Sequence, residues 1–183
     1  MEDAGGSVLV VDDDVLRTKT LREVLRPEFT FYAARNGREA VKAAEKILPD
    51  VILLDIPEPE FDGYSVFAEL KGSEKARDIP VIFISEHSDA ESEKRALRFG
   101  ASDYITKPFD PVIVKLRVQN QIKIISRIRL LFEKQIEEME RMKNEILTHL
   151  NTIIQMTRMF EALDNLNKED PDEPAVTPAS RLR

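Results

Sequence analysis

The chain has 183 residues, a net charge of −7 and no cysteine, which excludes disulfides and cysteine-based metal sites. Its 42% hydrophobic and 33% charged residues are typical of a globular protein, and its acidity argues against nucleic acid as a direct partner. No apolar run approaches the roughly 20 residues of a membrane span. The acidic N-terminus does not resemble a signal peptide, so we expect a cytoplasmic protein.

Short apolar runs alternate with segments of helical periodicity over the first two thirds of the chain. Strands are predicted at residues 7–11, 29–33, 51–55, 81–84 and 102–105. Helices are predicted between them, over about residues 15–25, 40–48, 64–70 and 89–99, and from Pro111 onward. Five repeats of strand then helix predict an α/β fold with a five-stranded parallel sheet that is doubly wound, with helices on both faces.

Polar residues follow several of these strands directly. Asp12 and Asp13 follow the first strand, Asp55 ends the third, Ser85 ends the fourth and Lys107 follows the fifth. In a parallel sheet the carboxyl ends of the strands share one edge, where ligands bind. We therefore expect these five side chains to converge. The alternatives are a helix cap for Asp12 and Asp13, a turn residue for Asp55, a plain strand-end hydroxyl for Ser85 and a surface charge for Lys107.

Three carboxylates in one place suit a hard divalent cation. Mg²⁺ prefers oxygen ligands and keeps several waters, so Asp12, Asp13 and a backbone carbonyl would suffice beside Asp55. With the repulsion between the carboxylates neutralised, Asp55 becomes a candidate nucleophile toward phosphorus. Lys107 would supply a positive charge to the phosphoryl group, and Ser85 a hydrogen bond.

Residues 6–121 resemble the receiver domain of two-component response regulators, which has the CheY-like, flavodoxin-like fold. Four stretches carry the resemblance in order and spacing: VLVVDDD, LLDIPEPEFDGY, IPVIFIS and FGASDYITKPF. The resemblance implies that a histidine kinase or phosphotransfer protein phosphorylates Asp55 in the presence of Mg²⁺. It implies no enzymatic activity beyond the domain's own phosphorylation and dephosphorylation.

The same resemblance implies roles for the other residues of this edge. Asp12, Asp13 and Asp55 would bind Mg²⁺ together with the backbone carbonyl of Pro57. Ser85 and Tyr104 would be the switch residues, Lys107 would sense the phosphoryl group, and the Lys107–Pro108 peptide bond would be cis.

Two positions depart from the family pattern. Pro57 keeps its carbonyl but has no N–H to donate to a phosphoryl group. Glu86, directly after Ser85, places a carboxylate where it would repel that group.

The last predicted helix does not stop at the end of the sheet. No glycine or proline interrupts residues 112–170. A heptad has two core positions, and a register that starts at Ile122 places an apolar residue at the second of them in every heptad. These second core positions are Ile125, Phe132, Met139, Ile146, Ile153 and Phe160. A helix of about 50 residues cannot bury such a stripe on a small domain. We expect a coiled-coil dimerisation extension over residues 122–167, and a disordered tail over residues 168–183.

The sequence thus predicts a response regulator that passes a signal from Asp55 through its last helix to a homodimerisation or interaction element. One alternative is a phosphorylation-silent receiver that acts as a protein-interaction scaffold. Another is the regulatory fragment of a larger regulator with an enzymatic output domain, and a third is a phosphorelay role for His149.

Overall fold

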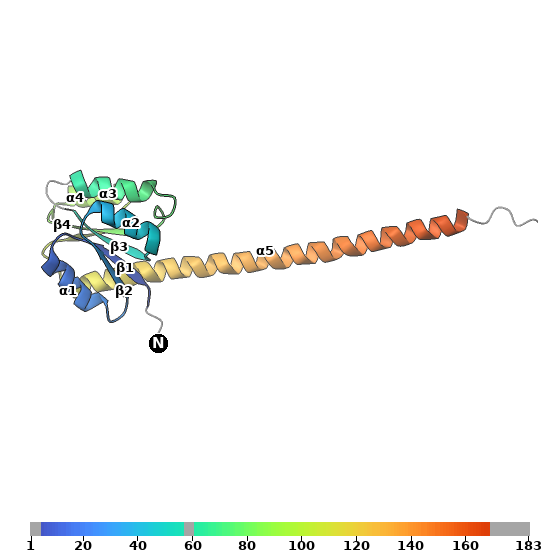
Figure 1. Cartoon of the computed structure of the whole chain (residues 1–183), viewed down its shortest axis with the longest axis horizontal. Helices are drawn as coiled ribbons and strands as arrows, with labels where there is room; N and C mark the ends of the chain where they lie inside the picture. The colour runs from blue at the N-terminus through green and yellow to red at the C-terminus, as the bar shows by residue number, and fades with distance from the viewer. Residues whose placement is uncertain (1–4, 57–60, 169–183) are drawn as a thin grey trace, which may run out of the picture. The chain divides into compact units, whose positions relative to one another are not determined.

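The structure, a computed structural model, describes residues 5–56 and 61–168; side chains are described for residues 5–56 and 63–165. Five strands and five helices alternate along the chain (Figure 1). The strands are β1 (Ser7–Val11), β2 (Thr30–Ala34), β3 (Val51–Ile56), β4 (Val81–Ser85) and β5 (Asp103–Thr106). The helices are α1 (Val15–Leu25), α2 (Gly37–Ile47), α3 (Phe61–Gly72), α4 (Ala90–Phe99) and α5 (Pro111–Lys168).

The five strands form one parallel sheet in the order β2-β1-β3-β4-β5, which confirms the predicted fold class. The strand order reverses direction between β1 and β3, which lie side by side with Val11 opposite Leu54. In doubly wound sheets this reversal opens a crevice at the carboxyl ends of the strands. The fold therefore places residues that follow β1 next to residues that end β3.

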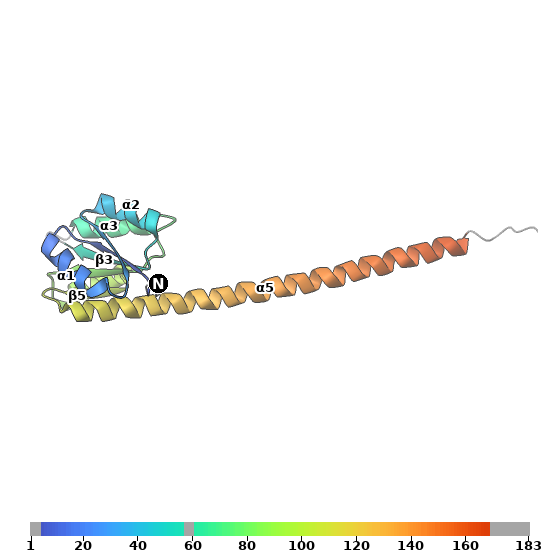
Figure 2. The ribbon, with the colours of Figure 1, turned by 60° about the horizontal axis from the view of Figure 1, so that its bottom comes forward.

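Two apolar layers hold the helices on opposite faces of the sheet. Alternate residues of β1 point to opposite faces, so Leu9 packs in one layer and Val10 in the other. The first layer lies under α2, α3 and α4, and the second lies under α1 and the first turns of α5 (Figures 1 and 2). Burial of the strands on both faces explains their almost uninterrupted apolar sequences.

Capping residues define where the helices begin and end. Asp14 caps α1 by accepting hydrogen bonds from the backbone N–H groups of Leu16 and Arg17. Asn36 caps α2 in the same manner through the N–H of Glu39. Gly100 ends α4 with a φ of 110°, a conformation that glycine adopts without steric cost.

Helix α5 has 58 residues and confirms the long terminal helix. The chain divides into two compact units, residues 1–129 and 130–183. Ile122 is buried in the core of the first unit, and Arg129 Nη1 lies 2.7 Å from Asp50 Oδ1 within that unit. Because of these contacts, the structure places the division after Arg129, whereas the sequence placed it after residue 121.

In the second unit, the apolar side chains that are described are exposed, as Ile146 and Phe160 illustrate at 65% each. The tail predicted from residue 168 lies outside the described residues, apart from Lys168, which ends α5. Over the part of the chain that the structure describes, none of the helices has the length and apolarity needed to cross a membrane.

Candidate functional site

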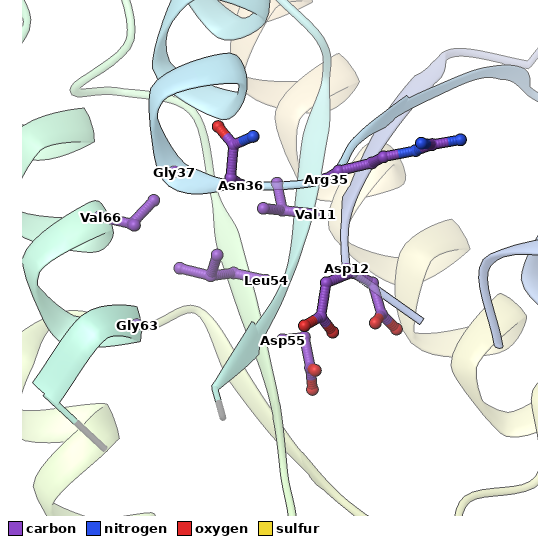
Figure 3. Close-up of a pocket in the computed structure, with 10 residues that line it drawn as sticks. Val11, Asp12, Arg35, Asn36, Gly37, Leu54, Asp55, Gly63 and Val66 are labelled. Atoms are coloured by element: carbon purple, nitrogen blue, oxygen red, sulfur yellow. The ribbon is translucent and has the colours of Figure 1, made fainter. Parts of the chain in front are cut away.

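Three carboxylates meet where β1 and β3 end. Asp12 directly follows β1, Asp13 comes next, and Asp55 is the last residue but one of β3. Each offers an oxygen within 4.8 Å of the others, and the side chains of Asp12 and Asp55 lie next to one another in Figure 3. They line a pocket of about 210 Å³ at this edge of the sheet. The convergence predicted for these three residues is therefore present.

This set of donors fits Mg²⁺. The ligands are hard carboxylate oxygens, and Asp13 is exposed, which leaves room for the waters that the ion retains. The expected fourth ligand, the carbonyl of Pro57, lies outside the described residues.

Lys107, directly after β5, reaches the carboxylate of Asp55. Its Nζ lies 2.5 Å from Asp55 Oδ1 and 3.4 Å from Glu86 Oε1. The Lys107 side chain is 9% exposed, whereas that of Glu86 is 56% exposed. Glu86 thus lies at the outer end of the lysine, beside the approach to Asp55. The Lys107–Pro108 peptide bond is cis, as the family resemblance implies.

Ser85 ends β4, and Tyr104 lies on the neighbouring strand β5. Ser85 is buried at the end of β4, with its Oγ accepting a hydrogen bond from the His87 N–H at 3.2 Å. Tyr104 packs in the core under α4, and its hydroxyl donates to the carbonyl of His87 at 2.8 Å. Both proposed switch residues therefore contact the same loop after β4.

Arg17 is a component of the site that sequence reasoning missed. Its Nε lies 2.5 Å from Asp12 Oδ2, and its Nη2 lies 2.8 Å from Asp12 Oδ1 and 2.9 Å from Asp55 Oδ2. A signal was present in the sequence, because Arg17 is the third residue of α1. A cation there opposes the positive end of the helix dipole and needs nearby carboxylates to compensate it.

The charges around Asp55 act in opposite directions. Burial is the largest influence and raises the pKa of Asp55; contact with Lys107 lowers the pKa, and the charge of Asp12 raises it. The net result is a pKa above the ordinary value for aspartate. Hydrogen bonding to Asp12 is the main reason why the pKa of the Arg17 guanidinium is raised. Asp55 is thus a desolvated carboxylate whose charge depends on its two cationic neighbours.

Comparison with known proteins decides the family. The family model of the response regulator receiver domain matches residues 8–119, more than half of the chain. The chain belongs to the response regulator receiver family. The receiver is a signalling module of two-component systems, and this match covers the sheet, all five carboxyl-terminal strand ends and the residues of the site.

Individual relatives with different names match this chain over part of their length. A protein-glutamate methylesterase/protein-glutamine glutaminase of Carboxydothermus hydrogenoformans is 39% identical over 67% of this chain and 36% of its own length. A probable cyclic di-GMP phosphodiesterase of Vibrio cholerae is 33% identical over 64% of this chain and 26% of its own length. The match thus spans only 36% and 26% of the lengths of these two relatives.

A solved structure provides a comparison for the metal site. The receiver domain of the sensor histidine kinase PA1611 of Pseudomonas aeruginosa has a TM-score of 0.58 and 29% sequence identity. The similarity covers 66% of this chain and 99% of that domain, which was solved with a magnesium ion in its active-site cleft. Receiver domains therefore bind Mg²⁺ at this place in the fold.

Proposed function

We propose that this receiver accepts a phosphoryl group on Asp55 from a phosphorylated histidine of a kinase or phosphotransfer protein. The observation that carries the proposal is the convergence of Asp55 with Asp12, Asp13 and Lys107 at one edge of the sheet. A buried aspartate flanked by two acidic residues and one lysine has the parts that phosphoryl transfer needs: a nucleophile, metal ligands and a fixed positive charge.

In the transfer step, an Asp55 carboxylate oxygen forms a bond to phosphorus while the phosphorus–nitrogen bond to the donor histidine breaks. The electron pair of the broken bond remains on the imidazole, and Asp55 becomes an acyl phosphate. Bound Mg²⁺, held by Asp12, Asp13, Asp55 and the Pro57 carbonyl, would neutralise charge on the phosphoryl oxygens. Lys107, 2.5 Å from Asp55 Oδ1, would move its contact to a phosphoryl oxygen.

The response would begin at the loop after β4. Ser85 would donate its hydroxyl hydrogen to the new phosphoryl group and draw this loop toward Asp55. Tyr104 donates its own hydrogen bond to His87 in the same loop, so a movement of the loop changes the surroundings of the tyrosine. We infer that the signal leaves the receiver through β5 and α5, on which Tyr104 and the following residues lie.

The output element in this proposal is the exposed apolar stripe of α5. A helix with this stripe would form a coiled-coil homodimer or bind a helical partner over residues 122–167. We place the protein in the cytoplasm, where histidine kinases present their phosphohistidine, and we propose no direct nucleic-acid contact. The enzymatic outputs named for the relatives make a regulatory piece of a larger protein the second candidate.

Intact-mass measurement after incubation with acetyl phosphate and Mg²⁺ tests the phosphorylation. We expect the wild-type chain to gain the mass of one phosphoryl group, and Asp55→Asn to gain none. As a matched control, Asp78→Asn alters an aspartate whose side chain is 92% exposed, and should gain mass as the wild type does. If the wild type gains no mass with any donor, the chain is a phosphorylation-silent receiver, and the scaffold hypothesis replaces ours.

A further inference from the structure

Arg17 holds the two buried carboxylates of the proposed metal site. Its guanidinium contacts both oxygens of Asp12 and one oxygen of Asp55, and the other oxygen of Asp55 contacts Lys107. The side chains of Asp12 and Asp55 are only 2% and 8% exposed. Each of their four carboxylate oxygens therefore already has a cationic partner from the chain itself.

A guanidinium in this position conflicts with a bound Mg²⁺. The ion takes oxygen ligands at about 2.0–2.1 Å in near-octahedral geometry, so it needs lone pairs of Asp12 and Asp55 that now accept from Arg17. In addition, two cations at neighbouring positions repel each other strongly where the surroundings are desolvated. Arg17 and Mg²⁺ therefore compete for the same two carboxylates.

The Arg17 side chain also has an alternative position, away from Asp12 and Asp55. Its side chain is 22% exposed, and its Nη1 already lies 3.8 Å from Oδ2 of Asp14, an exposed residue that caps α1. A rotation of the long arginine side chain would bring the guanidinium closer to Asp14 and to solvent, without moving the backbone of the helix. The exchange thus requires only a side-chain movement.

We propose that Arg17 is a tethered cation that occupies the metal position of this receiver, so that Mg²⁺ binds only by displacing the guanidinium. Arg17 keeps the carboxylates neutralised when metal is scarce, and it raises the Mg²⁺ concentration at which the receiver becomes competent. The inference rests on the proposed function, because it assigns to Arg17 control over the metal that phosphorylation of Asp55 uses.

Calorimetric titration of the full metal-stripped chain with MgCl₂, without any phosphodonor, tests the affinity. We expect Arg17→Ala to lower the Kd for Mg²⁺ by about tenfold or more, since it removes the repulsion and the competing contacts. Arg35→Ala is the matched control: it removes the same charge from a residue that lines the pocket of Asp12 and Asp55, but the Arg35 side chain points away from the carboxylates (Figure 3). The control should change the Kd by less than about threefold, as expected for a screened charge.

A second measurement follows the arginine side chains of the wild type by NMR, and uses a variant only to assign the Arg17 resonance. In the wild type, the Nε–H resonance of Arg17 should shift on addition of Mg²⁺, in step with the calorimetric isotherm, while that of Arg35 stays in place. Equal affinities of Arg17→Ala and Arg35→Ala, a weaker affinity of Arg17→Ala, or an unchanged Arg17 resonance at saturating Mg²⁺ would each overturn the proposal.

The same experiment separates this inference from the function on which it rests. If neither the wild type nor Arg17→Ala binds Mg²⁺, the metal site itself is refuted. If the wild type and Arg17→Ala bind Mg²⁺ with the same affinity and phosphorylation still occurs, only the role of Arg17 is refuted.

Discussion

Asp55 is an ionisable side chain in surroundings that disfavour its charge. Burial outweighs Lys107 and Arg17, so the pKa of the folded protein lies above the ordinary value of 3.8. At pH values between the ordinary pKa and the raised pKa of Asp55, the folded protein binds more protons than the unfolded chain. The free energy of unfolding therefore falls as the pH rises through this window, and below the window the contribution of Asp55 to stability is fully present.

From this follows a prediction about pH and stability in metal-free buffer. Asp55→Asn removes the titration, so its free energy of unfolding should decrease less than that of the wild type as the pH rises from about 4 to about 7. Urea unfolding at a series of pH values measures the difference. The surface variant Asp78→Asn should follow the wild-type curve, and parallel curves for Asp55→Asn and the wild type would contradict the prediction.

Among the elements, α2 and α3 approach each other closely at Gly37, the first residue of α2. A Cβ built at Gly37 would lie 2.2 Å from Val66 Cγ2 on α3, far inside normal contact. Valine is branched at Cβ and has few side-chain rotamers, so it cannot move aside freely. The close approach matters to the site, since Gly37 and Val66 both line the pocket of Asp55.

We expect Gly37→Ala to destabilise the protein by about 1–3 kcal/mol, the usual cost of overpacking a well-filled interface. Val66→Ala removes the clashing methyl groups, so the double variant should be more stable than the sum of the two single changes predicts. Denaturant unfolding of all four proteins gives the coupling energy. A coupling energy of zero would show that the backbone, and not Val66, absorbs the added methyl group.

At the scale of the whole molecule, the second unit carries a stripe of exposed apolar side chains that no described residue covers. Ile146 and Ile153 are 65% and 59% exposed and occupy equivalent positions one heptad apart. Because a monomer rarely leaves so long an apolar stripe in contact with water, a second helix should cover it.

The dimer is therefore a prediction for the full chain in solution. Light scattering should give the mass of a dimer for the wild type and of a monomer for Ile146→Glu/Ile153→Glu, in which four carboxylates would enter the interface. Asn144→Glu/Asn151→Glu adds the same charge to the same turns outside the core positions and should remain a dimer. A wild-type chain that is monomeric at every concentration would refute the dimer.

Local sequence determined most of the architecture and most of the residues of the site. The apolar runs of β1 and β3 with the carboxylates after them, the cap at Asp14 and the glycine at the end of α4 all express preferences of neighbouring residues, which can be read without tertiary contacts. The order of these elements then brought Asp12, Asp55 and Lys107 to one edge, because parallel strands end together.

Only the tertiary structure decided how the charges pair and where the core ends. Arg17 and Asp55 are 38 residues apart in sequence, and the pairing of a flexible side chain depends on distances that no periodicity encodes. For the same reason, the first compact unit reaches Arg129. The contact of Arg129 with Asp50 joins residues 79 apart in sequence, while α5 continues past Arg129 without any local signal of a boundary.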